Sequence, residues 1–292
     1  MNDDPENHAV ARIIDGRAVA QRVRTEATVR AQEFLARHGR QPGLGTLLVG
    51  DDPSSATYVA MKHRAGAKVG IAGFEEYLPA GATQSEVEAV VERFVADDRI
   101  DGVLVQMPLP AGLDPEPVIL RIPPEKDVDG FHPYNIGAIA TGLHGTASCT
   151  PAGVMTLLDA YEVPLAGADV VVVGRSRTVG MPMALLLLQR DATVTVTHLL
   201  TRDLAAATKQ ADVLIVAAGH PGLITADMVK PGAVVIDVGI TRTPDGVRGD
   251  VDFDGVREVA SLVSPVPGGV GPMTIATLLK STVELAWARA GD

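Results

Sequence analysis

The chain has 292 residues, with 36 acidic against 25 basic side chains and a formal net charge of -11. This length favours about two domains, and an acidic chain without a Lys/Arg cluster argues against a nucleic-acid partner, because phosphate neutralisation needs concentrated positive charge. The longest apolar run, MALLLL within residues 181–188, is far shorter than the roughly 20 residues that span a bilayer, so no membrane partner is expected.

The first half of the chain alternates helical and extended patterns. It starts with MNDDPENHAV, which is acidic, lacks the regions of a secretory signal and is expected to be a frayed tail. Apolar residues then recur at helical spacing over 18–38 and, after a capping box formed by Thr83 and Glu86, over 84–96. Another helix opens at DDPSS, with Ser54 or Ser55 as the expected cap. Strands are expected at GLGTLLVG (43–50) and DGVLVQMPLP (101–110).

The second half repeats this alternation, which is typical of an α/β fold with a mostly parallel sheet. Its short runs rich in Val, Ile and Thr predict strands at 168–174, 192–198, 212–219 and 233–239, in a doubly wound arrangement. A last helix, about 273–290, follows the loop PVPGGVGP and can pack back on the first domain. The domain boundary is expected near Cys149. Because Cys149 is the single cysteine of the chain, no intrachain disulfide can form, which fits a reducing compartment.

Tyr58 and Lys62 are four residues apart in SATYVAMKHRAG, so they share one face of the predicted helix. The ordinary alternative is a solvated lysine that rests on an aromatic ring. Gln106 is the polar residue in the apolar strand VLVQMP, and a buried amide at the carboxyl end of a strand needs partners. Ligands bind at that end in open α/β sheets. If Lys62 lies nearby, burial would lower its pKa and allow proton exchange near neutral pH.

VVVVGRSRTVGMPMALLLL combines a buried strand, a glycine turn and an apolar helix, a pattern that directs backbone N–H groups at a pyrophosphate. Position 176 is Ser, so the dinucleotide fingerprint is matched only in part, and a tight turn without a ligand is the alternative. Thr178 excludes a G-x-S-x-G elbow around Ser176. The second strand ends in THLLT and has no Asp or Glu to accept a hydrogen bond from a ribose 2′-hydroxyl. Arg175, in the first loop, can instead bind a 2′-phosphate. This favours NADP over NAD.

Two further loops have both a functional and an ordinary interpretation. PGGVGPMT (267–274) lacks the G-K-[ST] of a Walker A loop, and its glycines either let backbone approach a flat ligand or form a plain interdomain turn. PPEKDVDGFHPYN (123–135) contains Asp127 and Asp129 between turn formers, which is typical of a solvated turn as well as of a site. The seven histidines have no metal-ligand spacing, so no metal is expected.

Eight motifs in order along the chain, from about Ile13 to the last helix, resemble one family, the bifunctional methylenetetrahydrofolate dehydrogenase/methenyltetrahydrofolate cyclohydrolases. The motifs are YVAMK (58–62), GVLVQMPLP (102–110), PEKDVDGFHPYNIG (124–137), CTPAG (149–153), VVGRSRTVGMP (172–182), VIDVGI (235–240), GDVDF (249–253) and SPVPGGVGPMTIATLL (264–279).

The resemblance implies an NADP-dependent oxidation of 5,10-methylenetetrahydrofolate to the 5,10-methenyl compound, followed by hydrolysis to 10-formyltetrahydrofolate, in one-carbon metabolism and purine biosynthesis. It implies an N-terminal folate and catalytic domain at 1–148, with the helical segment 280–292 packed back on it, and a Rossmann-type NADP domain at 149–279, with a cleft between them. A cytoplasmic homodimer paired through the cofactor domain is expected on the same ground.

The resemblance also implies roles for individual residues. Lys62 would be the central proton-transfer group, Gln106 would keep its amine available, Tyr58 would stack on the folate, and Asp129 would hydrogen-bond the pterin. The substrate-binding set is Tyr58, Lys62, Val105, Gln106, Met107, Asp129, Pro267, Gly268, Gly269, Val270 and Gly271. The cofactor-binding set is Gly174, Arg175, Ser176 and Ile240.

Leu199 departs from the family pattern, in which Ser is frequent after the histidine of the second strand and can contact the 2′-phosphate. This weakens the NADP prediction without reversing it, since Arg175 is present. Three other functions are the alternatives. The presence of Tyr58, Lys62, Gln106 and Asp129 speaks against a dehydrogenase with little cyclohydrolase activity. A non-catalytic folate or nucleotide sensor would be expected to lack the lysine or an intact glycine loop, and a Rossmann oxidoreductase for an unrelated small acid would not account for the motifs of the first domain.

Overall fold

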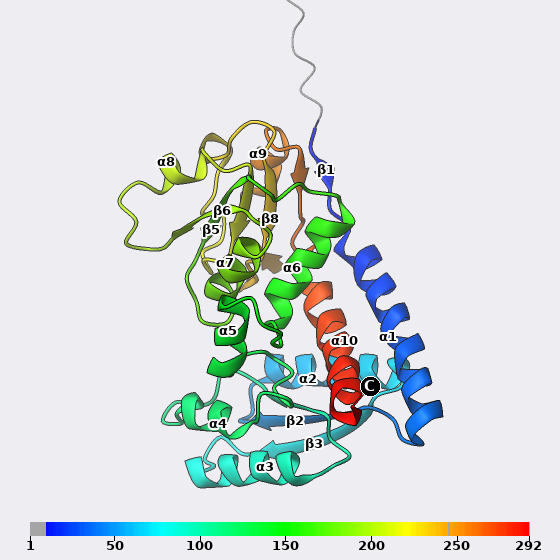
Figure 1. The fold of residues 1–292 in the computed structure, drawn as a ribbon. Coiled ribbons are helices and arrows are strands. Elements are labelled where there is room, and N and C mark those ends of the chain that lie inside the picture. The colour runs from blue at the N-terminus through cyan, green and yellow to red at the C-terminus, as the bar shows by residue number, and fades with distance from the viewer. Residues whose placement is uncertain (1–9, 245, 292) are drawn as a thin grey trace, which may run out of the picture. The chain divides into compact units, whose positions relative to one another are not determined.

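The computed structural model describes residues 10–244 and 246–291, so most of the predicted N-terminal tail lies outside the described residues. The chain divides into two compact units, and each is described by itself. Unit 1 contains the described residues up to Val19 together with Thr150–Thr274, and unit 2 contains Ala20–Cys149 and the chain from Ile275 onward. The divisions fall in α1 (Gly16–His38), at the start of α6 (Cys149–Ala160) and in α10 (Val270–Ala290) (Figure 1).

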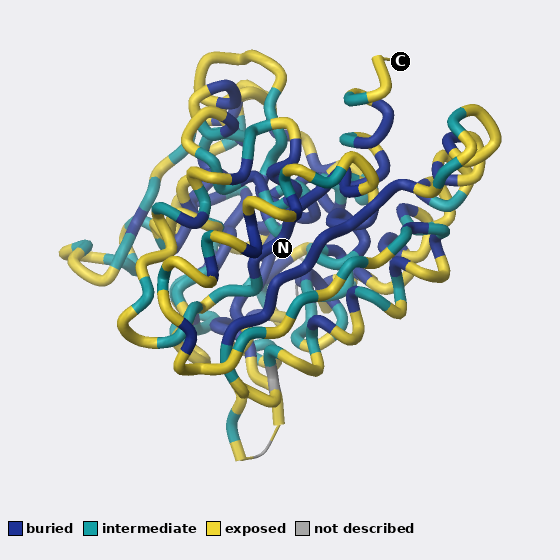
Figure 2. The backbone as a smooth tube through the Cα atoms, turned by 90° about the horizontal axis from the view of Figure 1, so that it is seen from below, coloured by how far each residue is buried: buried dark blue, intermediate teal, exposed yellow. Residues whose placement is uncertain are grey.

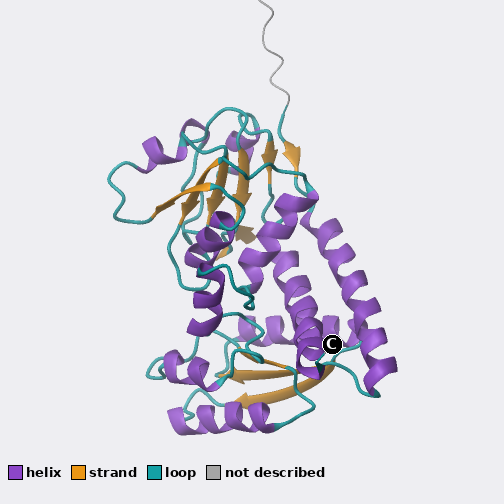
Figure 3. Ribbon diagram, viewed as in Figure 1, coloured by secondary structure: helices purple, strands orange, loops and turns teal. Residues whose placement is uncertain are grey.

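Unit 2 is built on a three-stranded parallel sheet in the order β3-β2-β4. Two of these strands confirm the sequence-based predictions, while β3 was not predicted. Successive parallel strands need right-handed crossovers, so α2 and α3 cover opposite faces of this sheet (Figure 3). The elements are β2 (Gly43–Val49), α2 (Pro53–Val69), β3 (Ala72–Leu78), α3 (Gln84–Ala96), β4 (Gly102–Val105), α4 (Pro115–Arg121) and α5 (Pro133–Ala140).

The starts of α2 and α3 show how local chemistry fixes these helices. The predicted capping box of α3 is confirmed: Thr83 accepts from the N–H of Glu86, and the Glu86 carboxylate accepts from the N–H of Thr83. The expected serine cap of α2 is wrong. Its cap is Asp52, whose carboxylate accepts from the backbone N–H of Ser55, and Pro53 occupies the first turn.

Unit 1 contains a six-stranded parallel sheet in the order β1-β11-β8-β7-β5-β6. The four predicted strands are β5 to β8, and the short β1 and β11 extend the sheet beyond β8. A separate antiparallel pair joins β9 and β10. The elements are β1 (Arg12–Ile13), β5 (Asp169–Val173), α7 (Gly180–Leu188), β6 (Thr193–Thr197), α8 (Leu204–Thr208), β7 (Val213–Val216), η1 (Ala226–Met228), β8 (Val234–Asp237), β9 (Thr241–Thr243), β10 (Gly246–Arg248), α9 (Phe253–Arg257) and β11 (Leu262–Val263).

The buried residues lie both on the strands and on the inward faces of the helices, whereas exposed residues lie on outer turns and outer helix faces (Figure 2). β2, β4, β7 and β8 are buried along their whole length, as expected for parallel strands covered by helices on both faces. In unit 2, α10 contributes to the core through Trp287, which makes an edge contact with the ring of the fully buried Phe34 of α1.

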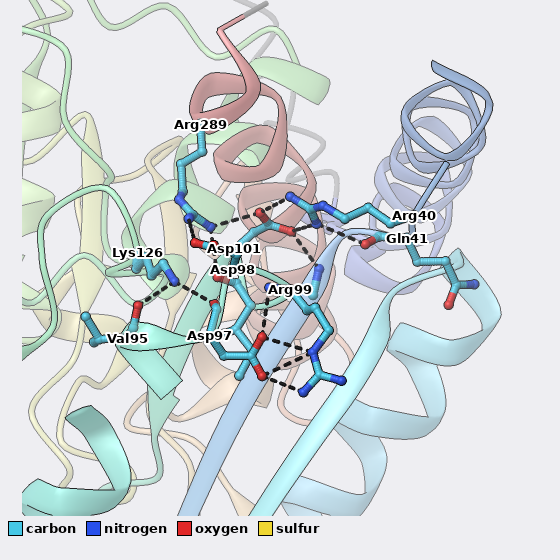
Figure 4. A network of polar contacts seen from close by, with 11 residues as sticks. Arg40, Gln41, Val95, Asp97, Asp98, Arg99, Asp101, Lys126 and Arg289 are labelled. Atoms are coloured by element: carbon cyan, nitrogen blue, oxygen red, sulfur yellow. Dashed lines mark hydrogen bonds and ion pairs between the residues drawn. The ribbon is translucent and has the colours of Figure 1, made fainter. Parts of the chain in front are cut away.

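A network of ion pairs fixes the start of β4 in unit 2 (Figure 4). The carboxylate of Asp101 is fully buried and accepts two hydrogen bonds from Arg40, at 2.7 and 2.8 Å, and one from Arg289 of α10 at 3.0 Å. It also accepts from the backbone N–H of Gly43, at the start of β2. Two guanidinium groups and a backbone donor therefore compensate the cost of burying this charge.

Candidate active site

Lys62 and Tyr58 lie on one face of α2, as their spacing predicted. The Lys62 ammonium nitrogen is 4.8 Å from the centre of the Tyr58 ring, within the range of a cation–π contact. Lys62 is only 6% exposed, whereas its neighbour Met61 is 40% exposed. The alternative of a solvated lysine is therefore wrong, and the amine lies in the interior of unit 2.

Gln106 provides the polar partner of this buried amine. It is the first residue after β4, and its backbone N–H donates to Leu47 of β2, which continues the sheet pairing by one residue. Its side-chain oxygen accepts a hydrogen bond of 3.0 Å from Lys62 Nζ, and its side-chain nitrogen donates to the carbonyl of Met107. Both ends of the amide are thus used, and its oxygen is directed at the lysine. The strand end and the helix converge on one point.

Asp129 introduces a second ionisable group beside Lys62. Burial raises the pKa of Asp129 from 3.8 to about 6, and the positive charge of Lys62 acts in the opposite direction. Burial also lowers the pKa of Lys62 below its ordinary 10.5, while the charge of Asp129 raises it. Burial likewise raises the pKa of Tyr58 to about 12, so its hydroxyl stays protonated at neutral pH. The low-dielectric surroundings favour the neutral form of all three groups.

The segment that carries Asp129 is held by its neighbour Asp127. Asp127 is 2% exposed and accepts from the backbone N–H of His132 and from the side-chain amide of Asn135, at 2.8 and 2.9 Å. It also pairs with Val103 of β4 in an isolated bridge. The alternative of a solvated turn is wrong, because Asp127 is buried and its segment is attached to the sheet.

Cys149 is a member of this neighbourhood that sequence reasoning assigned only to a helix entry. It is the first residue of α6, as expected, and its buried thiol lies 3.4 Å from the carbonyl oxygen of Val128. Burial raises the pKa of the thiol well above its ordinary value, and the charges of Asp129 and Lys62 also act on it. The thiol therefore stays protonated and is unsuited to act as a nucleophile. The CTPAG motif that contains Cys149 was the only feature of the sequence that indicated a place near the site.

Val105 and Met107, which were also predicted to bind the substrate, pack against the apolar core of unit 2. Val105 is 4% exposed, and its side chain belongs to the apolar core of unit 2. Met107 is partly buried against the same core. Any contact between Val105 and a ligand would therefore involve its backbone.

The chemistry available to the Lys62 group is proton transfer. A buried amine with a lowered pKa can take a proton from water and return it to a leaving nitrogen, provided that one neighbour orients it. Gln106 supplies that orientation, and the Tyr58 ring offers a flat surface on which an aromatic ligand can stack. This geometry is compatible with acid–base chemistry on a flat ligand.

The glycine turn of unit 1 has the shape expected for a phosphate-binding loop. Gly174 follows β5 with φ of +121°, and a Cβ atom there would collide with the carbonyl oxygen of Ala217, so only glycine fits. The Ser176 hydroxyl accepts from the N–H groups of Val179 and Gly180, which closes the turn at the start of α7. Arg175 is exposed beside this turn, where its guanidinium can meet an anionic group. The glycine turn and the positive charge of Arg175 suit an anionic group, whereas the N–H groups of Val179 and Gly180 are already used by the Ser176 hydroxyl.

The loop predicted to contact folate also lies in unit 1. It runs through Pro267, Gly268, Gly269, Val270 and Gly271 into the first turn of α10. Gly268 has φ of +114°, and a Cβ atom on Gly16 would collide with the carbonyl of Gly269, so the two backbones are in close contact. A Cβ atom on Gly271 would lie 3.6 Å from Ile240 Cδ1. The structure therefore places the predicted cofactor residue Ile240 next to this glycine loop.

Leu199 is 89% exposed and follows His198 in the loop after β6.

No helix in the described part of the chain combines the length and apolar character needed to cross a membrane. Over residues 10–244 and 246–291, no group of three or more His, Cys, Asp or Glu side chains is placed to hold a metal ion.

Comparisons with known proteins agree across both halves of the chain. The family "Tetrahydrofolate dehydrogenase/cyclohydrolase, catalytic domain" matches residues 14–129, and the family's "NAD(P)-binding domain" matches residues 148–290. The bifunctional protein FolD 2 of Frankia alni is 56% identical over 278 residues, which cover 95% of this chain and 96% of that protein.

Two solved structures have the same fold. The bifunctional FolD dehydrogenase/cyclohydrolase of Campylobacter jejuni is 45% identical with a TM-score of 0.93, covering 96% of this chain and 99% of that chain. The Trypanosoma brucei FolD structure, complexed with NADP cofactor and inhibitor, is 39% identical with a TM-score of 0.93, covering 97% of this chain and 100% of that chain.

Proposed function

Because the chain belongs to the tetrahydrofolate dehydrogenase/cyclohydrolase family, we propose that Lys62 carries the protons of its hydrolytic reaction. The protein is a bifunctional one-carbon folate enzyme. It oxidises 5,10-methylenetetrahydrofolate to the 5,10-methenyl compound with NADP and hydrolyses that compound to 10-formyltetrahydrofolate. The observation that carries the assignment of Lys62 is its burial together with the hydrogen bond from its amine to Gln106.

Hydrolysis needs more from the protein than oxidation does. Water adds to the methenyl carbon and loses a proton. The bond from that carbon to the ring nitrogen then breaks as the nitrogen gains a proton and the added hydroxyl loses its own proton to become the formyl oxygen, so the cation is hydrolysed with the net release of one proton to solvent. Lys62 in its neutral form accepts the proton from water and then returns it to the departing nitrogen. Burial lowers the pKa of Lys62 below its ordinary 10.5, which makes the neutral form of the amine easier to reach. Gln106 holds the amine in place, and Tyr58 stacks on the folate ring.

Asp129 binds the pterin in this proposal. A pterin presents ring and exocyclic N–H donors side by side, and a carboxylate accepts from both. The pKa of about 6 for Asp129 leaves it ionised at neutral pH and close enough to titration for mild acid to weaken the contact. Val105 and Met107 contribute through the backbone at the end of β4.

The cofactor residues are proposed to be Gly174, Arg175, Ser176 and Ile240. NADP supplies a hydride acceptor for the oxidation step. The Gly174 turn, at the carboxyl end of β5, receives the pyrophosphate, and the exposed Arg175 pairs with the 2′-phosphate. Pro267, Gly268, Gly269, Val270 and Gly271 are proposed to contact the folate through backbone.

The organisation of the molecule is also proposed. We assign folate binding to residues 1–148 with the helical segment 280–292, and NADP binding to residues 149–279. The ranges matched by the two family domains, 14–129 and 148–290, support a boundary near residue 148. The compact unit that joins Ala20–Cys149 with the chain from Ile275 onward supports placing the last helical segment with the folate domain. We further propose a cytoplasmic homodimer paired through the cofactor domain, on the strength of the family resemblance. Light scattering on the purified full chain tests the dimer, and a monomer at micromolar concentration would reject it.

The function is tested by supplying 5,10-methylenetetrahydrofolate with NADP or with NAD, and by following reduced cofactor and methenyl absorbance together. We expect reduced cofactor to form faster with NADP, and the methenyl compound to be consumed as 10-formyltetrahydrofolate appears. In a separate assay without cofactor, added methenyl compound should be hydrolysed. Failure to hydrolyse it would leave a dehydrogenase alone, and binding of both ligands without turnover would indicate a sensor.

A further inference from the structure

The GDVDF motif (249–253) contains a buried carboxylate that the proposed reaction does not use. Asp250 has no exposed surface, and the hydrogen bonds that hold its side chain come from backbone groups. Its Oδ2 atom accepts hydrogen bonds from the backbone N–H groups of Ala218 and Gly219, at 2.7 and 2.8 Å. Its Oδ1 atom is buried and has no hydrogen-bond partner among the described residues. The carboxylate therefore acts on the backbone that follows β7.

That backbone is in direct contact with the glycine turn. Ala217 donates its N–H to Val173, the last residue of β5, at 2.7 Å. The carbonyl oxygen of Ala217 occupies the space that a Cβ atom on Gly174 would need. The chain after β7 is thus held by Asp250 on one side and forms the surface against which Gly174 packs on the other. A shift of residues 217–219 would be transmitted to the turn.

A second buried carboxylate, Asp237 at the end of β8, fixes Asp250 in turn. Its Oδ1 atom accepts from the N–H groups of Gly239 and Asp250, at 2.9 and 3.0 Å, and its Oδ2 atom accepts from Val251 at 3.0 Å. A Cβ atom on Gly249 would collide with the Asp237 carboxylate, and one on Gly239 would collide with the Asp250 carboxylate. The two glycines allow the two acidic segments to pack against each other.

Five backbone N–H groups therefore point at two carboxylates at the carboxyl ends of β7 and β8. This is the edge of a parallel sheet at which ligands bind. Two neighbouring buried anions are a costly way to gain stability alone, since apolar side chains of similar size do as well or better. What the carboxylates supply is a defined backbone geometry at this edge.

We propose that Asp250 is a positioning residue for the dinucleotide: it holds residues 217–219 against Gly174 and so sets the shape of the turn that receives the cofactor. Asp237 supports it by holding the backbone of Asp250 and Val251. The inference rests on the proposed cofactor site at Gly174. Asp250 is enclosed by protein and does not touch the cofactor, so its effect is on cofactor affinity and not on the reacting atoms.

The test compares Asp250→Ala and Asp250→Asn with the wild type and with Asp254→Ala, a control at an exposed position of the same segment. Three quantities are measured on the full chain: the KM for NADP, the kcat of oxidation at saturating NADP, and the rate of methenyl hydrolysis without cofactor. We expect Asp250→Ala to raise the KM for NADP about tenfold, the effect of losing about 1.4 kcal/mol of cofactor binding. The kcat and the rate of hydrolysis should change little.

Asp250→Asn keeps an oxygen that can accept from both N–H groups but loses the charge that strengthens these bonds. Its KM for NADP should lie between those of the wild type and of Asp250→Ala. If Asp250→Ala does not fold, Asp250→Asn decides the question, and a wild-type KM for NADP would overturn the proposal. Equal losses of hydrolysis and of NADP affinity would also overturn it, because they would indicate a general role in stability. A wild type that neither binds NADP nor reduces it would instead reject the proposed function.

Discussion

Replacing Asp129 with Asn should stabilise unit 2, and the gain should depend on pH. Burial raises the pKa of this carboxyl from 3.8 to about 6, so folding favours the protonated acid. The stability that the protonated acid contributes is fully present below pH 3.8 and is lost as the pH rises through about 6. The difference between the two pKa values corresponds to at most about 3 kcal/mol, since each pH unit is about 1.4 kcal/mol. Asn does not ionise, so it avoids this loss.

The assay is urea unfolding of the wild type and Asp129→Asn across this pH range. We expect the two unfolding free energies to be similar at about pH 4 and the variant to be more stable at about pH 8, by no more than about 3 kcal/mol. Asp98→Asn, at a side chain fully open to solvent, is the matched control and should show no comparable trend. A stability difference for Asp129→Asn that is constant with pH would refute the reasoning, because it would mean that the carboxyl titrates normally in the folded chain.

Three other substitutions test separate parts of the account. Gln106→Leu removes the acceptor for the Lys62 amine and should destabilise the fold by about 1–3 kcal/mol and slow methenyl hydrolysis; an unchanged rate would remove the amide from its role. Arg175→Ala should raise the KM for NADP far more than the KM for NAD, and equal effects on the two would reject the contact with the 2′-phosphate. Asp101→Asn leaves two arginines without their buried partner and should lower the unfolding free energy by about 3 kcal/mol, whereas Asp98→Asn should have little effect in the same urea titration.

The core of the candidate site was predictable because its signals are local. Tyr58 and Lys62 are separated by about one helical turn, and a helix brings such residues together whatever the rest of the fold does. Gln106 interrupts an apolar strand at its carboxyl end, where a buried amide must find a partner. That Lys62 lies beside Gln106 was only a condition of the argument from the residues and was otherwise implied by the family resemblance; the hydrogen bond between the two side chains confirms it.

Other features depend on contacts that no local pattern contains. β1 and β11 have two residues each and are about 250 positions apart, so their pairing arises only from the complete sheet. The two hydrogen bonds from residues 218 and 219 to Asp250 span 32 and 31 positions, which is also beyond the reach of a local pattern. β3 also lacks a clear local signal: its positions alternate between partly buried and exposed, but Glu76 lies on the partly buried face and Tyr77 on the exposed one, so its segment AGFEEYL shows no period-two hydropathy pattern.

The most direct test of the central claim is the rate at which Lys62→Met hydrolyses the methenyl compound without cofactor. Met fills a similar volume and removes only the ionisable amine, so the fold and NADP affinity should be retained. Our account predicts that the hydrolysis rate falls at least about a hundredfold, as expected for the loss of a general acid–base group. Hydrolysis at the wild-type rate by the folded variant would contradict it.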